Sequence, residues 1–114
     1  MGCRGRMARR ISRGDVWLYT FGKPDRRRPV VVLTRPEVIG LLHTVTVAPV
    51  TSTIHGAPSE VILGPDEGLN HESAANMDHL QTVQQSGLHT FLGRLSAQKL
   101  REVCRAVGIA LGCR

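Results

Sequence analysis

The sequence predicts a mainly β protein of the α+β class, in which a small barrel-like sheet of short antiparallel strands is closed by one C-terminal helix. Short runs of β-branched and aromatic residues, separated by turns rich in glycine and proline, occupy most of the chain and indicate the strands. Helical periodicity of apolar residues is found in the C-terminal segment. The 114 residues suffice for one domain with a modest core.

Three strands are predicted in the first half of the chain. The β-branched and aromatic run Asp15–Phe21 is typical of a strand. The run Pro29–Thr34 is continuously apolar, which indicates a strand covered on both faces, and proline is tolerated at its first residue. The run His43–Thr51 alternates between polar and apolar residues, and Pro49 places its end at an edge or a bulge of the sheet.

Four shorter extended segments follow in the second half of the chain. Turn-forming residues separate them, as in an all-β barrel with short connections. The predicted segments are Glu60–Leu63, Ser73–Asp78, Leu80–Val83 and Thr90–Gly93.

One helix is predicted, over Ala97–Leu111. Ser96 has the side chain of a helix N-cap, and Gly112 is suited to the left-handed residue that ends a helix. The spacing predicts one apolar stripe, on which Cys104 is a packing residue. The stripe consists of Leu100, Val103, Cys104, Val107 and Leu111.

The chain divides into a basic arm, residues 1–12, and a single domain, residues 13–114. Fifteen Lys and Arg against nine Asp and Glu give a formal net charge of +6, which favours polyanionic partners. The arginines cluster in the arm and again at Arg26, Arg27 and Arg28. The arm therefore either holds nucleic acid electrostatically or is a tail without a role.

Aromatic residues make up only 4% of the chain, which argues against a binding platform built on base stacking. Trp17, Tyr19 and Phe21 lie in the first predicted strand and are expected in the core.

The sequence predicts no metal site and no cofactor. The three cysteines lack the paired spacing of zinc ligands or of a disulfide framework, which favours a reducing cytoplasm. Phosphate-loop, nucleophile-elbow and other common cofactor or catalytic motifs do not occur, and no apolar run is long enough to span a membrane. Any catalysis must therefore use ordinary side chains.

The second and third predicted strands bring a candidate catalytic pair together. If the two strands form an antiparallel hairpin with Thr34 opposite Val45, then Arg28 lies opposite Thr51. A fixed cation beside a hydroxyl at a sheet edge can hold a phosphodiester. The alternative is an arginine in a surface ion pair beside an ordinary strand threonine.

Several sequence blocks resemble, in order, those of the MazF/PemK toxins. The similarity covers about residues 12 to 112. The blocks are Arg13-Gly-Asp-Val-Trp17, Arg28-Pro-Val-Val-Val-Leu33, Val47-Ala-Pro-Val-Thr51-Ser-Thr53, Gly68-Leu-Asn70 with Ser73, Asn76-Met-Asp78, Gln81-Thr-Val83 and Gly93-Arg-Leu-Ser96.

The resemblance implies an SH3-like barrel, a homodimer, and a toxin of a type II toxin–antitoxin system that is inhibited by a cognate MazE-like antitoxin. It also implies a metal-independent, sequence-selective endoribonuclease that cleaves single-stranded RNA through its own 2′-hydroxyl, leaving a 2′,3′-cyclic phosphate and a 5′-hydroxyl. The family's catalytic arginine and threonine match Arg28 and Thr51.

Further residues are candidates for RNA binding because they flank the pair or lie in matching blocks. They are Arg26, Arg27, Ser52, Thr53, His55, Asp78 and Gln81. The chain departs from the family pattern in two places: residues 22–27 form a short loop, and Gln81 stands where arginine is common. These departures bear on RNA specificity.

No general base is evident. His55 could titrate usefully near Thr51 or be a solvated loop residue, and the remaining histidines are expected to be structural or solvent-facing: His43, His71, His79 and His89.

Two other functions remain open at the level of sequence. A CcdB-like toxin that poisons DNA gyrase would need no catalytic pair, and fold does not fix function. A non-catalytic nucleic-acid-binding barrel module would need only the basic charge.

Overall fold

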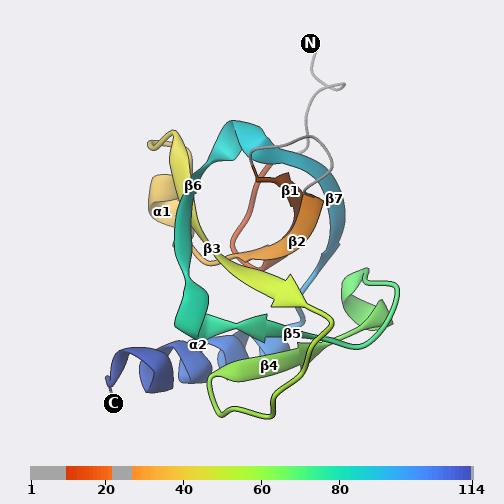
Figure 1. The fold of residues 1–114 in the computed structure, drawn as a ribbon. Coiled ribbons are helices and arrows are strands. Elements are labelled where there is room, and N and C mark those ends of the chain that lie inside the picture. The colour runs from red at the N-terminus through yellow and green to blue at the C-terminus, as the bar shows by residue number, and fades with distance from the viewer. Residues whose placement is uncertain (1–9, 22–26, 114) are drawn as a thin grey trace.

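A computed structural model describes residues 10–21 and 27–113 of the chain. The described residues form seven strands and two α-helices, joined in part by short 3-10 turns (Figure 1). The strands are β1 (Asp15–Thr20), β2 (Arg27–Val32), β3 (Thr44–Thr51), β4 (Glu60–Leu63), β5 (Ser73–Asn76), β6 (Gln81–Gln84) and β7 (Leu88–Arg94). The helices are α1 (Pro36–Ile39) and α2 (Ala97–Leu111), and the 3-10 turns are η1 (Pro65–Glu67), η2 (Met77–His79) and η3 (Gln85–Gly87).

All strand pairs are antiparallel, and β3 organises the sheet. The order of neighbours is β4-β5-β3-β2-β1-β7, while β6 pairs with the first half of β3. The second half of β3 pairs with β5, through Val50 opposite Ala75 and Thr51 opposite Ala74. The change of partner along β3 lets the sheet curl into a half-barrel, with α2 lying across one end (Figure 1). The predicted fold, a small antiparallel sheet with a C-terminal helix, is confirmed.

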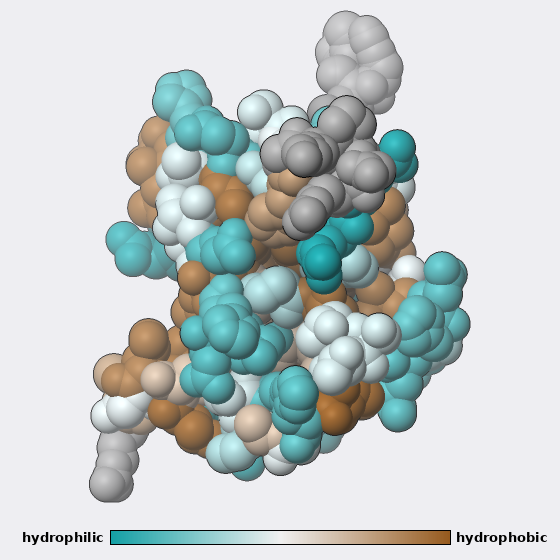
Figure 2. All heavy atoms as spheres, in the orientation of Figure 1, coloured by the Kyte–Doolittle hydropathy of each residue, from teal (hydrophilic) through white to brown (hydrophobic). Residues whose placement is uncertain are grey.

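Hydrophobic side chains are exposed near α1 and at the end of α2. Leu41 is 78% exposed and Leu111 is 63% exposed, and Leu42 and Ile109 are also exposed. Figure 2 shows hydrophobic surface on the side of the molecule where α1 and the C-terminal end of α2 lie. No helix within residues 10–21 and 27–113 is long and apolar enough to cross a membrane.

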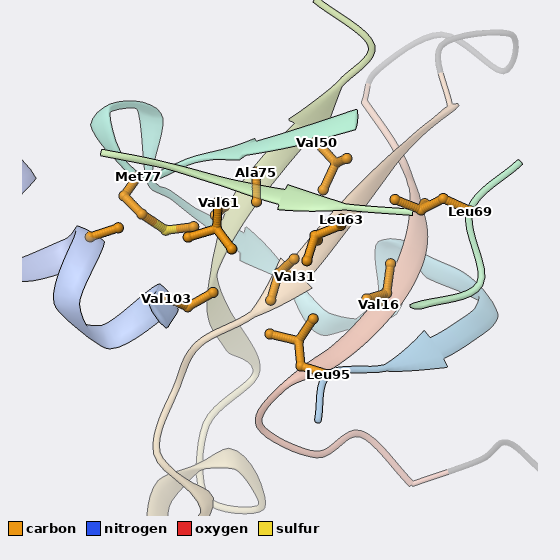
Figure 3. Packing of buried hydrophobic residues seen from close by; sticks show 12 residues of the cluster. Val16, Val31, Val50, Val61, Leu63, Leu69, Ala75, Met77, Leu95 and Val103 are labelled. Atoms are coloured by element: carbon orange, nitrogen blue, oxygen red, sulfur yellow. The ribbon is translucent and has the colours of Figure 1, made fainter. Parts of the chain in front are cut away.

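Apolar residues pack on both faces of β2, as its continuous apolar run predicts. Val31 belongs to a cluster that includes Leu63 of β4 and Val103 of α2, and Figure 3 shows these side chains facing one interior. Val30 and Val32 belong to a second cluster with Trp17 on the opposite face. Because successive strand residues point to opposite faces, β2 and β3 contribute side chains to both clusters and lie between them.

Helix α2 has the predicted bounds and caps. The Ser96 hydroxyl accepts a hydrogen bond from the backbone N–H of Lys99 over 3.1 Å, and Gly112 ends the helix with a φ of 74°. The predicted stripe is wrong in part, since Cys104 and Leu111 are exposed whereas Val103 and Ala106 are buried. The small Ala106 side chain allows α2 to pack against β4 and η2, which turns the face that carries Cys104 outward.

The structure differs from the sequence-based expectations at two other places, the end of one strand and an additional short helix. The predicted strand Ser73–Asp78 stops at Asn76, because the Asn76 side chain accepts a hydrogen bond from the Asp78 backbone N–H over 2.8 Å and turns the chain into η2. The short helix α1 was not predicted. Of the proposed basic arm, residues 1–9 lie outside the described part, while Ile11 packs against the second cluster.

Candidate functional site

The ends of β2 and β3 bring Arg28 and Thr51 to the same edge of the curled sheet. The observed register pairs Val30 with Pro49 and Val32 with Val47, which is the register predicted from sequence. Continued by two residues, this register places Arg28 opposite Thr51. The two side chains lie on the same face of the sheet, because residues directly opposite each other on antiparallel strands project to the same side.

Two adjacent pockets share Arg28 and Thr51 in their walls. Pocket A has a volume of about 420 Å³, and its other polar lining residues are Arg27, Ser52, His71 and Ser73. Pocket B has a volume of about 630 Å³, and its lining includes Phe21, Thr53, His55, Asn76, His79 and Gln81. The arginine–threonine pair therefore stands at the boundary between two binding spaces.

The charge of both pockets favours an anion. Arg27 and Arg28 are exposed at the start of β2, and no Asp or Glu among the described residues lines pocket A or pocket B. An arginine guanidinium carries a permanent charge and two parallel N–H donors that match the oxygens of a phosphate. A phosphodiester placed at the shared wall would meet this cation and the Thr51 hydroxyl together.

The loop after β3 is held by the carboxylate of Glu60. Oε1 of Glu60 accepts hydrogen bonds from the backbone N–H groups of His55, over 3.1 Å, and of Gly56, over 2.9 Å. Hydrogen bonds to a charged acceptor are about twice as strong as neutral ones. The carboxylate thus fixes the path of the segment that carries Thr53 and His55 into pocket B.

The structure places most of the predicted RNA-binding residues in the two pockets. Arg27 and Ser52 line pocket A, whereas Thr53, His55 and Gln81 line pocket B. Asp78 lines neither pocket, and its Oδ2 accepts a hydrogen bond of 2.5 Å from the Ser59 hydroxyl. Arg26 lies outside the described residues.

Several residues that line the pockets were not among the candidates from sequence, and they include two histidines, Phe21 and Asn76. His71 and His79 were expected to be structural or solvent-facing, and both are exposed. His71 also lines pocket A, and His79 also lines pocket B. Phe21 was expected in the core, yet it is half-buried, packs edge-on against Tyr19 and lines pocket B. Asn76 also lines pocket B. No local sequence signal distinguishes these residues, because their loops meet only through long-range strand pairing.

Comparison with known proteins identifies a family resemblance over almost the whole chain. Residues 12–111 match the family model described as PemK-like, MazF-like toxin of type II toxin–antitoxin system. The chain is 40% identical over 103 residues to the probable endoribonuclease MazF5 of Mycobacterium tuberculosis (strain ATCC 25618 / H37Rv), covering 90% of this chain and 94% of the relative.

Solved structures give the same result. The Mycobacterium tuberculosis toxin MazF-mt6 matches with a TM-score of 0.81 and 33% identity, covering 88% of this chain and 98% of that one. A chain in a crystal structure of MazE-MazF from Deinococcus radiodurans matches with a TM-score of 0.78 and 26% identity, covering 94% of this chain and 100% of that one.

Proposed function

The chain belongs to the family of PemK-like, MazF-like toxins of type II toxin–antitoxin systems, and we propose that it is a sequence-selective endoribonuclease that cleaves single-stranded RNA without a metal ion. Its relatives are named endoribonucleases. The observation that carries the proposal is the juxtaposition of Arg28 and Thr51 at the wall shared by two pockets that no described acidic residue lines.

The reaction would use the RNA's own 2′-hydroxyl as the nucleophile. Attack on the adjacent phosphorus forms the 2′-O–P bond and breaks the P–O5′ bond, which leaves a 2′,3′-cyclic phosphate and a 5′-hydroxyl. Negative charge accumulates on the phosphorane oxygens, and Arg28 supplies a fixed cation to stabilise it. The Thr51 hydroxyl donates a hydrogen bond to the same phosphate. Neither residue forms a covalent bond to RNA.

RNA binding is assigned to further residues of the two pockets. Arg27 adds a second cation at pocket A, and Ser52 adds a hydroxyl. Thr53, His55 and Gln81 would contact the nucleotide on the side of pocket B. Base edges of splayed single-stranded RNA are read by side-chain hydrogen bonds. We assign Asp78 a supporting role, because its carboxylate is bonded to Ser59.

An antitoxin and a second copy of the chain are the proposed protein partners. The solved MazE-MazF complex matches this chain along its length, which supports a MazE-like antitoxin. An acidic segment of such a partner would compete with RNA for Arg27 and Arg28. The exposed Leu41 and Leu111 provide apolar surface that a homodimer could cover. We expect the toxin to act in the cytoplasm.

RNA cleavage by the purified full-length chain in the presence of EDTA tests the proposed function. We expect a defined set of cuts with cyclic phosphate ends, and loss of these cuts in Arg28→Ala and Thr51→Ala. RNA that stays intact with the wild-type chain, or inhibition of DNA gyrase without RNA cleavage, would overturn the proposal. Full cleavage by a folded Arg28→Ala variant would overturn the assignment of the site.

A further inference from the structure

Pockets A and B meet at a wall formed by Arg28, Val50 and Thr51. A phosphate held by Arg28 and Thr51 therefore has one pocket on each side. An RNA strand that passes through the site would place the nucleotide before the cut in one pocket and the nucleotide after it in the other.

Cleavage through the 2′-hydroxyl places the two proton transfers on opposite sides of the phosphorus. The attacking 2′-oxygen and the departing 5′-oxygen occupy opposite apical positions of the phosphorane in an in-line displacement. The base that takes the 2′ proton and the acid that protonates the 5′-oxygen must then approach from opposite directions. One acid–base group is needed on each side of the wall.

Histidine supplies that chemistry on both sides. Imidazole accepts and donates protons readily near neutral pH, whereas arginine stays charged and threonine stays neutral. Among the described lining residues, His71 is the imidazole of pocket A, and His55 and His79 are those of pocket B. No described Asp, Glu, Lys or Cys lines either pocket.

The surroundings of His79 distinguish it from His55. His79 ends η2, a turn that packs against α2 and β3 and that the hydrogen bond from the Asp78 backbone N–H to Asn76 holds closed. His55 lies outside any strand or helix, in the exposed loop after β3 that the Glu60 carboxylate holds through backbone N–H groups. Regular elements position a side chain more precisely than loops, which favours His79 over His55 in pocket B, whereas His71, in the turn before β5, is the imidazole that pocket A offers among the described residues.

We propose that His71 and His79 are the acid–base pair of this ribonuclease, one on each side of the Arg28–Thr51 wall. The proposal rests on the proposed function. One imidazole takes the proton of the 2′-hydroxyl as the 2′-O–P bond forms, and the other, already protonated, gives its proton to O5′ as the P–O5′ bond breaks. The two histidines end with exchanged protonation states, which proton exchange with water restores.

Single-turnover cleavage of two synthetic RNAs tests the pair. One RNA is unmodified, and the other carries sulfur in place of the bridging 5′-oxygen at the cut site. On unmodified RNA, His71→Ala and His79→Ala should each lose about 100- to 10,000-fold in rate, the usual contribution of a general acid or base. A thiolate leaves without being protonated, so the sulfur-bridged RNA should rescue the variant that lacks the acid to within about tenfold of wild type. It should not rescue the variant that lacks the base.

The controls separate this proposal from the proposed function. His89→Ala removes an exposed histidine of β7 that lines neither pocket, and it should cleave like wild type. His71 and His79 are both exposed, so the His71→Ala and His79→Ala variants should unfold at the wild-type temperature. Near wild-type rates for either variant, or rescue of both or of neither, would overturn the pair while Arg28→Ala stays inactive. A wild-type chain that cleaves neither RNA would instead overturn the proposed function.

Discussion

The backbone N–H of Thr53 donates a hydrogen bond to the hydroxyl oxygen of Thr51 over 3.2 Å. This bond occupies a lone pair of the hydroxyl oxygen and leaves its proton available to a second partner. Because Thr51 lines both pockets, that partner can be a phosphate oxygen at their shared wall. The local turn therefore prepares Thr51 to act as a donor.

Substitutions at Thr51 should separate the contribution of its hydroxyl to activity from the contribution of its methyl group. Thr51→Ser keeps the donor and should retain activity to within about tenfold, whereas Thr51→Ala and Thr51→Val should each lose about 100-fold or more, as is typical when one positioned donor is removed. Single-turnover rates on a short RNA measure the effect. Activity in Thr51→Val equal to that of Thr51→Ser would show that the hydroxyl is not used.

Substitutions at Arg28 test the fixed cation and its coupling to Thr51. Arg28→Ala should lose about 100- to 1,000-fold in rate, and Arg28→Lys should recover only part of this because a point charge lacks the guanidinium's paired donors. The double variant Arg28→Ala/Thr51→Ala should lose much less than the product of the single losses, since both residues act on one phosphate. Losses that multiply fully would show that the two residues act independently.

Removing the Glu60 carboxylate should loosen the loop after β3 and weaken RNA binding. Glu60→Ala should raise KM about tenfold with a smaller change in kcat, because each lost hydrogen bond to a charged acceptor is worth about 1.5 to 3 kcal/mol. Glu60→Gln keeps an acceptor oxygen and should change KM less. Glu37→Ala, at an exposed residue of α1, is the matched control. An unchanged KM in Glu60→Ala would show that the loop keeps its path without the carboxylate.

Gly68 and Gly93 should be essential for stability because backbones touch there. A Cβ at Gly93 would lie 2.3 Å from the carbonyl oxygen of Glu67, and a Cβ at Gly68 would lie 2.0 Å from that of Leu92. Each alanine variant should lower the free energy of unfolding by about 3 kcal/mol, measured by denaturant titration at fixed protein concentration.

Gly40→Ala is the control for these two variants. Nothing lies within 4 Å of its would-be Cβ, and its φ of −76° suits any residue, so we expect a change within about 0.5 kcal/mol. A similar loss of stability in all three variants would contradict the role assigned to the close backbone contact.

The sequence was sufficient to predict the seven strands and helix α2, but not the short helix α1. Strands β1 to β4 and helix α2 follow from signals that act within a few residues: alternation, turn formers, the Ser96 cap and the Gly112 stop. The observed register of β2 against β3 agrees with the hairpin considered from the sequence, in which Thr34 lies opposite Val45. From that register alone, Arg28 and Thr51 come together.

Tertiary structure decided what surrounds this pair. His71, His79 and Phe21 come from separate turns and strand ends, and they reach the two pockets because β3 changes partner from β6 to β5 and curls the sheet. Tertiary packing also turned Cys104 outward, since the small Ala106 brings α2 close to η2 and β4. Local sequence patterns encode periodicity and turns, whereas the direction in which a helix face or a loop side chain points depends on contacts between residues far apart in the chain.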